Sequence, residues 1–194
     1  MNLRSKFFSL CAVLIILGAT TQAQVADTLF GKNDTLYVDM TEIKSGQWSL
    51  GISYSNKNAI TAISVPLKYN AGLAKLIADS AVYAGGRVET WAFKGFRCDT
   101  AIQVITLGMI ANLGPSSKNV LNAGSGRLVT VFLHAADSLK PGPLVVDTCT
   151  SYPNNTLQTV GDFSNLNLKE GEKITAEMVT KLTIAPAFMV RKEK

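Results

Sequence analysis

Apolar and polar residues alternate with a period of two along most of the chain after residue 35. The segments 36–41, 48–55 and 62–69 each place apolar side chains at every second position, with Ser, Gly, Thr or Lys at most of the others. Successive side chains of a strand point to opposite faces of a sheet. Each segment therefore predicts a strand with one buried face and one solvated face.

Further strands are expected wherever β-branched and apolar residues stand between turn residues. The segments that start at Ile102 and at Leu128 are apolar on both faces, which predicts central strands. Pro66 cannot donate to a ladder, so the strand that contains it is expected at a sheet edge or with a bulge there. The remaining candidate strands are 80–83, 88–96, 101–111, 127–134 and 144–149.

The end of the chain is more ambiguous. Residues 174–184 predict one or two closing strands, and a short helix over 176–182 is the alternative. Many short strands separated by Gly, Pro, Asn and Ser, without alternating helices, are typical of an all-β protein. The pattern therefore predicts an all-β sandwich or barrel, and a nucleotide-binding α/β fold is not expected.

The N-terminus has the three parts of a secretory signal. Arg4 and Lys6 precede an apolar run over 7–19, and small residues around Ala23 provide a cleavage site. The alternative is an uncleaved membrane anchor, but the run is short for a spanning helix. The expected division is a signal peptide over 1–23, a flexible leader over 24–33, one domain over 34–190 and a basic tail over 191–194. The localisation would be extracellular or periplasmic.

Charge narrows the range of partners. The chain has 19 basic and 14 acidic residues, and removing the signal removes Arg4 and Lys6, which leaves 17 against 14, a net charge of +3. The basic residues are scattered, whereas nucleic-acid binders usually carry a basic stripe with interleaved aromatics. We expect no nucleic-acid partner, and no membrane contact after signal cleavage.

The cysteine and histidine residues limit which covalent links and catalytic sites the chain could form. In an oxidising compartment Cys98 and Cys149 most simply form one disulfide, and two separate buried thiols are the alternative. His134 is the one histidine, and no Gly-x-Ser-x-Gly element accompanies it. No spacing among the acids selects a catalytic pair. We therefore predict a protein that is not an enzyme and has no cofactor and no metal site.

Trp91 and Phe93 are the aromatic candidates for a binding site. They stand two apart, so they would share one face of the strand predicted over 88–96. Exposed, they would form a stacking platform for sugar rings, and buried, they would belong to the core. A carbohydrate-binding module that recognises polysaccharide through these two rings is the alternative function.

Two segments resemble bacterial cohesin domains. In the first, a strand ends in a polar turn with Asn58, and the next strand finishes in Leu67-x-Tyr69-Asn70. In the second, Gly124-Ser125-Gly126-Arg127-Leu128 is similar to the Gly-x-Gly-x-Leu strand entry of that family. The matching positions within the first segment are Asn58, Ile60, Ala62, Ile63, Leu67, Tyr69 and Asn70.

The resemblance implies an all-β fold, a two-sheet antiparallel β-sandwich of the jelly-roll type, related in architecture to carbohydrate-binding modules. It also implies a non-catalytic module that holds a dockerin-bearing exported protein through one sheet face, within an extracellular polysaccharide-degrading assembly. Because the matching positions are core and turn residues, no partner-contacting residue is carried over. The pair Cys98 and Cys149 is not part of the family pattern.

Overall fold

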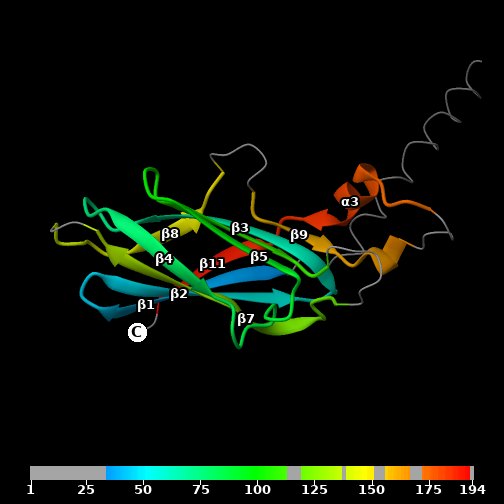
Figure 1. Cartoon of the computed structure of the whole chain (residues 1–194), viewed down its shortest axis with the longest axis horizontal. Helices are drawn as coiled ribbons and strands as arrows, with labels where there is room; N and C mark the ends of the chain where they lie inside the picture. The colour runs from blue at the N-terminus through cyan, green and yellow to red at the C-terminus, as the bar shows by residue number, and fades with distance from the viewer. Residues whose placement is uncertain (1–33, 113–118, 137–138, 151–155, 167–171, 193–194) are drawn as a thin grey trace, which may run out of the picture. The chain divides into compact units, whose positions relative to one another are not determined.

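The computed structural model describes residues 34–112, 119–136, 139–150, 156–166 and 172–192, and its regular structure is mostly β (Figure 1). The predicted signal peptide, the leader over 24–33 and residues 193–194 lie outside this part. None of its helices is both long and apolar enough to cross a bilayer. The elements are β1 (Thr35–Lys44), β2 (Gln47–Asn56), β3 (Ile60–Asn70), β4 (Leu76–Val82), β5 (Phe93–Asp99), β6 (Val104–Ile110), β7 (Gly124–Ala135), β8 (Val145–Thr148), β9 (Gln158–Gly161), η1 (Phe163–Leu166), α3 (Ala176–Leu182), β10 (Thr183–Ile184) and β11 (Ala187–Lys192).

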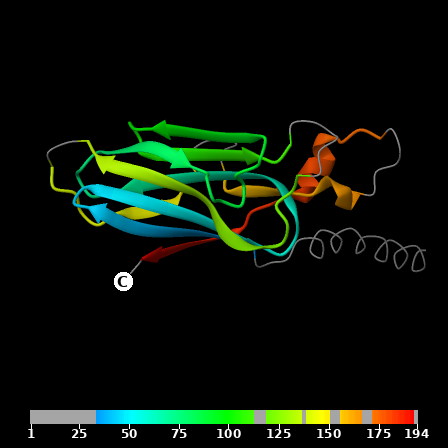
Figure 2. The same ribbon diagram turned by 60° about the horizontal axis from the view of Figure 1, so that its bottom comes forward.

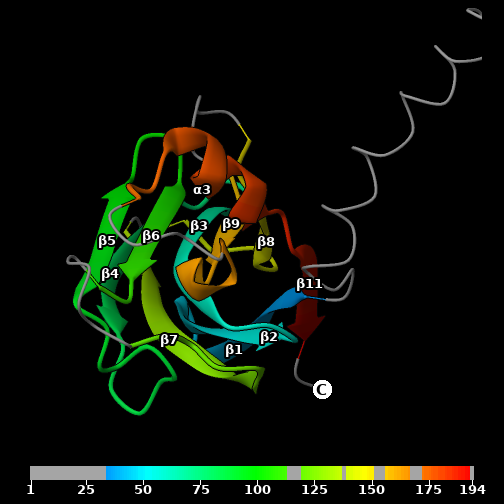
Figure 3. The same ribbon diagram turned by 90° about the vertical axis from the view of Figure 1, so that its right-hand side faces the viewer.

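The strands form two sheets. In the described chain one sheet has the order β11-β1-β2-β7-β4, and the other has the order β10-β9-β3-β6-β5 with β8 also paired to β3. Figure 3, which looks along the strands, shows the two layers on either side of the core. β11 runs parallel to β1, and Figure 2 shows it in red beside blue β1 at the sheet edge. The predicted jelly-roll β-sandwich is confirmed.

The core consists of the alternating apolar residues that face each other between the sheets. Leu50, Ile52 and Tyr54 of β2 are fully buried, and they share one apolar cluster with Val65 and Leu67 of β3. Burying an aliphatic side chain of this size stabilises the fold by about 1.5–3 kcal/mol. β6 and β7, the two strands with apolar residues on both faces, are internal in their sheets, as predicted.

Pro66 lies in a central strand, so the expected edge strand or bulge at that residue is wrong. β3 pairs with β6 along one side, and along the other side with β9 through residues 60–64 and with β8 through 67–70. The Pro66 carbonyl accepts a hydrogen bond from the Cys149 N–H at 3.1 Å. The N and O of one strand residue face the same neighbour. The missing proline N–H therefore falls at the junction between β8 and β9.

Two predicted strands are shorter than expected, because turns occupy part of one segment and a helix occupies part of the other. Residues 84–90 are turns, with the Glu89 N–H bonded to the Gly86 carbonyl and the Trp91 N–H to the Val88 carbonyl, both at 3.0 Å. β5 consequently begins at Phe93 rather than at residue 88. Thr175 caps α3 by accepting a hydrogen bond from the Met178 N–H, and the helix alternative is confirmed over 176–182. Of the closing strands expected over 174–184, the two-residue β10 forms at Thr183–Ile184 and pairs with β9.

The last strand was not predicted. β11 extends to Lys192, past the point at which the sequence placed the end of the domain and the start of a basic tail. Arg191 pairs in register with Asp39 of β1. A parallel partner far away in sequence gives no local signal. The strand conformation of β11 therefore comes from its pairing with β1, which the local sequence pattern of residues 187–192 does not predict.

Arg87 fixes the end of the sandwich at which β2 ends and β7 begins. Its guanidinium donates hydrogen bonds to the carbonyls of Tyr54, Asn122 and Gly124 and to Asn56 Oδ1, over 2.6–3.1 Å. Burial of this side chain lowers the pKa of Arg87. The close approach explains the Gly-x-Gly element, since a Cβ at residue 126 would lie 3.1 Å from Arg87 Cδ.

A buried polar link joins the two sheets. The Tyr54 hydroxyl of β2 lies 3.0 Å from Asp34 Oδ2 and 3.3 Å from Thr159 Oγ1 of β9. Asp34 Oδ1 also accepts the Lys57 N–H at 2.9 Å. Burial away from water raises the pKa of Tyr54 well above its usual range. The phenol therefore stays neutral and serves as a fixed hydrogen-bonding group in the core.

Candidate protein-binding face

The candidate site is the outer face of the β9–β3–β6–β5 sheet, which we call the open face. The strand register arranges its outward side chains in rows that cross the four strands. The first row is apolar and consists of Val160, Ala62, Ile110 and Phe93. The second row is small or polar and consists of Gln158, Ser64, Gly108 and Gly95.

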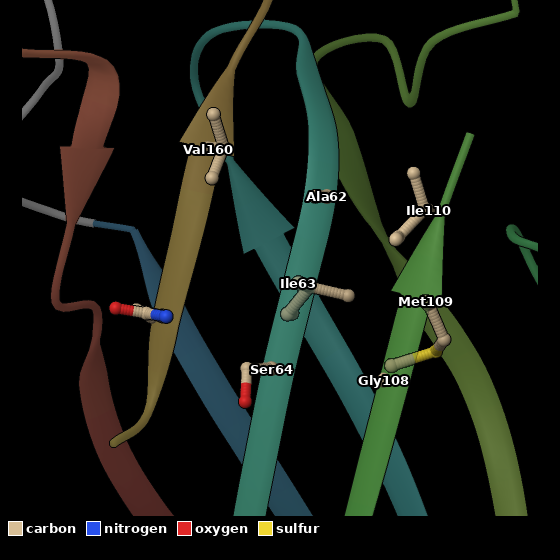
Figure 4. A pocket seen from close by; sticks show the side chains of 8 residues that line it. Ala62, Ile63, Ser64, Gly108, Met109, Ile110 and Val160 are labelled. Carbon is tan, nitrogen blue, oxygen red and sulfur yellow. The ribbon is translucent and has the colours of Figure 1, made fainter. Parts of the chain in front are cut away.

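A shallow depression of about 190 Å³ lies where the first two rows cross β9, β3 and β6. Its floor is low because Ala62, Ser64 and Gly108 have short side chains or none. Ile110 and Val160 stand on its two sides, as Figure 4 shows. A depression with mostly apolar walls on an exposed sheet can receive an aliphatic side chain from another molecule.

Phe93 covers the neighbouring part of the same face. A Cβ built on Gly95 would come within 2.9 Å of the Phe93 ring, and one on Gly108 within 3.7 Å. The ring therefore lies flat across two glycines on adjacent strands. It is still 44% exposed, and Ile110 beside it is 36% exposed. Ring and depression together form a continuous apolar surface.

Charged residues occupy the other half of the open face. Arg97 of β5 lies one step beyond Gly95, and Lys68 of β3 lies one further step along. Both side chains are exposed. Asp99 and Asp147 stand in the same row as Lys68, on β5 and β8. The face thus changes from apolar to charged along the strand direction.

The outer face of the other sheet, which we call the closed face, is organised differently. Asp39 accepts hydrogen bonds from Arg191 Nε at 2.7 Å and Nη2 at 3.0 Å. Arg127 Nη2 lies 3.9 Å from the same carboxylate, and its guanidinium covers Gly51. The Arg191 guanidinium also lies 4.4 Å from the centre of the Tyr37 ring. These contacts join β11, β1 and β7.

The predicted disulfide is not formed, because Cys98 and Cys149 are both free thiols. Cys98 lies on β5 and Cys149 follows β8, with β6 and β3 between them in the sheet. Three strand spacings separate the cysteines by about 14 Å. A disulfide needs Cα atoms within about 7 Å. The Cys98 thiol instead lies 3.3 Å from the Tyr69 hydroxyl.

The predicted aromatic platform is also absent. Trp91 is 2% exposed and belongs to the core, whereas Phe93 is exposed on the open face. Trp91 lies in the turn region before β5, so the assumption of a shared strand face fails. The core alternative is confirmed for Trp91 and is wrong for Phe93.

The described side chains present little other chemistry. Within them, no group of three or more His, Cys, Asp and Glu residues is arranged to hold a metal ion. His134 Nδ1 lies 2.8 Å from Asp79 Oδ1, and both side chains are more than one third exposed. This pair is located at the β-bulge of β4 against β7. It forms an exposed contact between two strands.

Sequence reasoning missed the main residues of the open face, namely Ala62, Ile110, Val160 and Arg97. The short outward residues of 62–64 and the glycine at 108 were visible signals. Their meaning required the pairing of β3 with β6 and β9, which links segments more than thirty residues apart. Local periodicity indicates which face of a strand each side chain occupies, but not which strand lies next to it in the sheet.

Comparison with known proteins identifies the architecture. Neither a family model nor a curated protein matches the sequence. Solved structures do match, and one is an OlpA cohesin–dockerin complex from Clostridium thermocellum, with a TM-score of 0.57 and 12% identity over 83% of this chain and 99% of that chain. The sixth cohesin of scaffoldin B from Acetivibrio cellulolyticus, in complex with a Cel5 dockerin mutant, has a TM-score of 0.56 and 13% identity over 83% and 99%.

The third cohesin of ScaC from Acetivibrio cellulolyticus, in complex with a ScaB dockerin, has a TM-score of 0.55 and 14% identity, over 82% of this chain and 97% of that chain. All three comparisons extend over nearly the whole of the matched chain. They agree with the resemblance seen at 58–70 and 124–128 in the sequence. The described domain therefore has a cohesin-like fold.

Proposed function

We propose that this chain is an exported, non-catalytic binding module that holds another protein on its open face. The observation that carries the proposal is the apolar row of Val160, Ala62, Ile110 and Phe93 beside a depression. Single exposed apolar residues are common on protein surfaces, but a contiguous apolar surface marks an interaction site. An apolar centre with a charged margin is the usual composition of a protein interface.

We further propose that the partner is a dockerin-type module of an exported protein, within a polysaccharide-degrading assembly. Two observations support this choice. The sequence resembles cohesins at core and turn positions, and the similar solved structures are cohesins in complex with dockerins. The N-terminal segment over 1–23 supports export, because its charge and hydropathy pattern is that of a secretory signal.

The test is an affinity capture with matched variants. The chain without residues 1–23 is immobilised and washed with the exported proteins of its source organism. Ile110→Asp places a charge in the open face, and Val82→Asp places one on β4 of the other sheet, where Val82 is 44% exposed. We expect wild type and Val82→Asp to retain the same protein. Ile110→Asp should weaken binding at least about thirtyfold, as for a central interface residue.

Equal retention by Ile110→Asp and wild type would show that the open face is not the binding surface. A captured protein with Asp-x-Asn-x-Asp-Gly repeats, released by calcium chelation, would support a dockerin-type partner, since such repeats hold calcium through their oxygen ligands. The melting temperatures of both variants are measured alongside. A folded Ile110→Asp protein assigns the lost binding to the face itself.

A polysaccharide pull-down in parallel tests the alternative function. With Trp91 buried, a sugar could stack only on Phe93 of the predicted pair. Retention by an insoluble glycan, lost in Phe93→Ala, with no captured protein would replace the proposed function by carbohydrate binding. Retention of protein without glycan would exclude that alternative.

A further inference from the structure

Arg97 is the one arginine of the described chain whose side chain has no partner within it. Arg87 binds three carbonyls and an amide oxygen, and both Arg127 and Arg191 contact Asp39. Arg97 is exposed on β5 and makes no such contact. A guanidinium presents five donors in a rigid fork that fits a carboxylate. Among the four described arginines, that fork is left unused at Arg97, on the open face.

The position of Arg97 connects it to the depression. It lies on the same side of β5 as Phe93 and Gly95, and it is paired with Thr106 of β6. The residue next to it in the direction of the apolar row is Gly95, and the Phe93 ring lies across that glycine. Arg97 therefore stands next to the position that the exposed ring covers, and its guanidinium can reach a molecule that covers both the ring and the depression.

The nearby acids do not neutralise this half of the face through ion pairs with Arg97. Asp99 Oδ1 accepts the N–H groups of Ala101 and Ile102, at 3.0 and 3.4 Å, and so stabilises the β5–β6 turn. Asp147 Oδ1 accepts the Thr148 N–H at 2.7 Å. Lys68 adds a second exposed cation in the next row. Two cations and two acidic residues therefore share this half of the face, and the group left unused there is the guanidinium of Arg97 rather than a net positive charge.

We infer that the partner segment presents a carboxylate to Arg97 and an aliphatic side chain to the depression, an inference that rests on the proposed function. Arg97 is then the specificity-determining residue of the open face. Docking would exclude water from this contact and strengthen the charged hydrogen bonds. A partner with a cation at that position would instead meet like charge and be rejected.

Strand geometry sets the spacing that the partner needs. The middle of the depression and the Arg97 Cα differ by about three residues along the strands and by two strand spacings across them, or about 14 Å. The arginine side chain covers part of this distance. On a helix, residues four or seven apart lie on one face at about 6 or 10 Å. A helical partner would carry its carboxylate four or seven residues from the aliphatic anchor.

The test uses two matched helical peptides of about 20 residues. Both are rich in alanine and glutamine, with leucines at the centre of one face. One peptide carries glutamates one and two turns to either side of the leucines, and the other carries lysines there. Binding is measured by titration into the ¹⁵N-labelled chain, through chemical-shift changes at the open face. We expect the glutamate peptide to bind at least about tenfold more tightly.

Arg97→Glu should reverse this preference, and Arg97→Lys should keep it at reduced strength, because lysine lacks the planar fork. Lys44→Glu makes the same charge change on the β1–β2 hairpin of the other sheet and should leave the preference unchanged. An unchanged preference in Arg97→Glu, or no shift changes on the open face with either peptide, would overturn the inference. If Ile110→Asp still abolishes protein capture in that case, the proposed function stands without it.

Discussion

The two outer faces of this sandwich use their charged residues in opposite ways. On the closed face, Asp39 accepts a hydrogen bond from Arg191 and forms an ion pair with Arg127, and these contacts link β11, β1 and β7. On the open face, Arg97 and Lys68 are exposed next to an apolar surface with a depression. One face satisfies its charges internally, and the other leaves them available to a second molecule.

This difference teaches where to look for function in a sandwich without catalytic residues. A face whose ion pairs are complete gains little from a partner, because a partner would have to break contacts that already exist. A face with exposed apolar groups and an unpaired cation gains from burial and from pairing. The comparison can be tested by substituting matched residues and measuring stability and binding separately.

The largest effect should come from Trp91 and Phe93, which sequence spacing placed together. Trp91→Ala removes a core side chain and should lower the free energy of unfolding by about 3–5 kcal/mol. Phe93→Ala removes an exposed ring of the open face and should cost less than about 1 kcal/mol while weakening partner binding. Chemical denaturation of both variants checks the contrast. Similar losses of stability would mean that Phe93 belongs to the core.

The same pair shows how far sequence reasoning reaches. Alternation correctly predicted the inward residues of β2 and β3, because burial of one sheet face imposes a period of two. It failed at Trp91, where the turns formed by 84–90 end the strand pattern. Turn hydrogen bonds are local, but the sequence of this loop also contains apolar residues that imitate a strand.

The candidate site was harder to predict from the sequence than the fold. The open face is made by β9, β3, β6 and β5, whose pairing order is not sequential. Each strand contributes only two to four outward residues, and none is unusual by itself. The failed disulfide has the same origin, since Cys98 and Cys149 lie in one sheet but three strands apart. Long-range pairing, rather than local propensity, decided both.

Arg87 and Arg97 offer the next comparison, ten residues apart. Arg87→Ala leaves the carbonyls of Tyr54, Asn122 and Gly124 without their donor, and should cost about 3 kcal/mol of stability. Arg97→Ala removes no internal contact and should change stability by less than about 0.5 kcal/mol. Urea unfolding measures both. A large loss in Arg97→Ala would show that its guanidinium is structural and would weaken the distinction between the two faces.

A smaller effect is expected when Arg191 on the closed face and Arg97 on the open face are each replaced by glutamine. Arg191→Gln loses two hydrogen bonds to Asp39 and the contact with Tyr37. The side chain is half exposed, so the loss should be about 1 kcal/mol, or roughly 2–4 °C in melting temperature. The loss of stability in Arg191→Gln should be smaller at high salt, because salt screens exposed ion pairs.

Binding of the partner, measured by affinity capture, should rank Arg191→Gln and Arg97→Gln in the opposite order to stability. Arg191→Gln should bind as well as wild type, since the closed face does not take part. Arg97→Gln should keep its stability and lose affinity. If Arg191→Gln lost binding while it remained folded, the assignment of the interface to one face would be wrong.

The smallest effect concerns Tyr83, which bridges the two sheets where β4 and β5 lie close together. Its hydroxyl donates a hydrogen bond to the Gly95 carbonyl at 3.1 Å. Burial raises the pKa of Tyr83 to about 12, above the value near 10 of an unfolded chain. The native state thus holds this proton more tightly. Its contribution to stability is complete below pH 10 and is lost as the pH rises from 10 to 12.

Tyr83→Phe removes the titrating hydroxyl and should therefore show a shallower loss of stability between pH 10 and 12 than wild type. At pH 7 the variant should lose less than about 1 kcal/mol, the net value of one hydrogen bond. Tyr54 and Tyr69, whose pKa values burial also raises, are present in both proteins, so the difference isolates Tyr83. Urea midpoints at pH 9, 10 and 11 measure it. Parallel curves would mean that the phenol of Tyr83 is as well solvated in the native state as in the unfolded chain, and that the sheets are open to water at this edge.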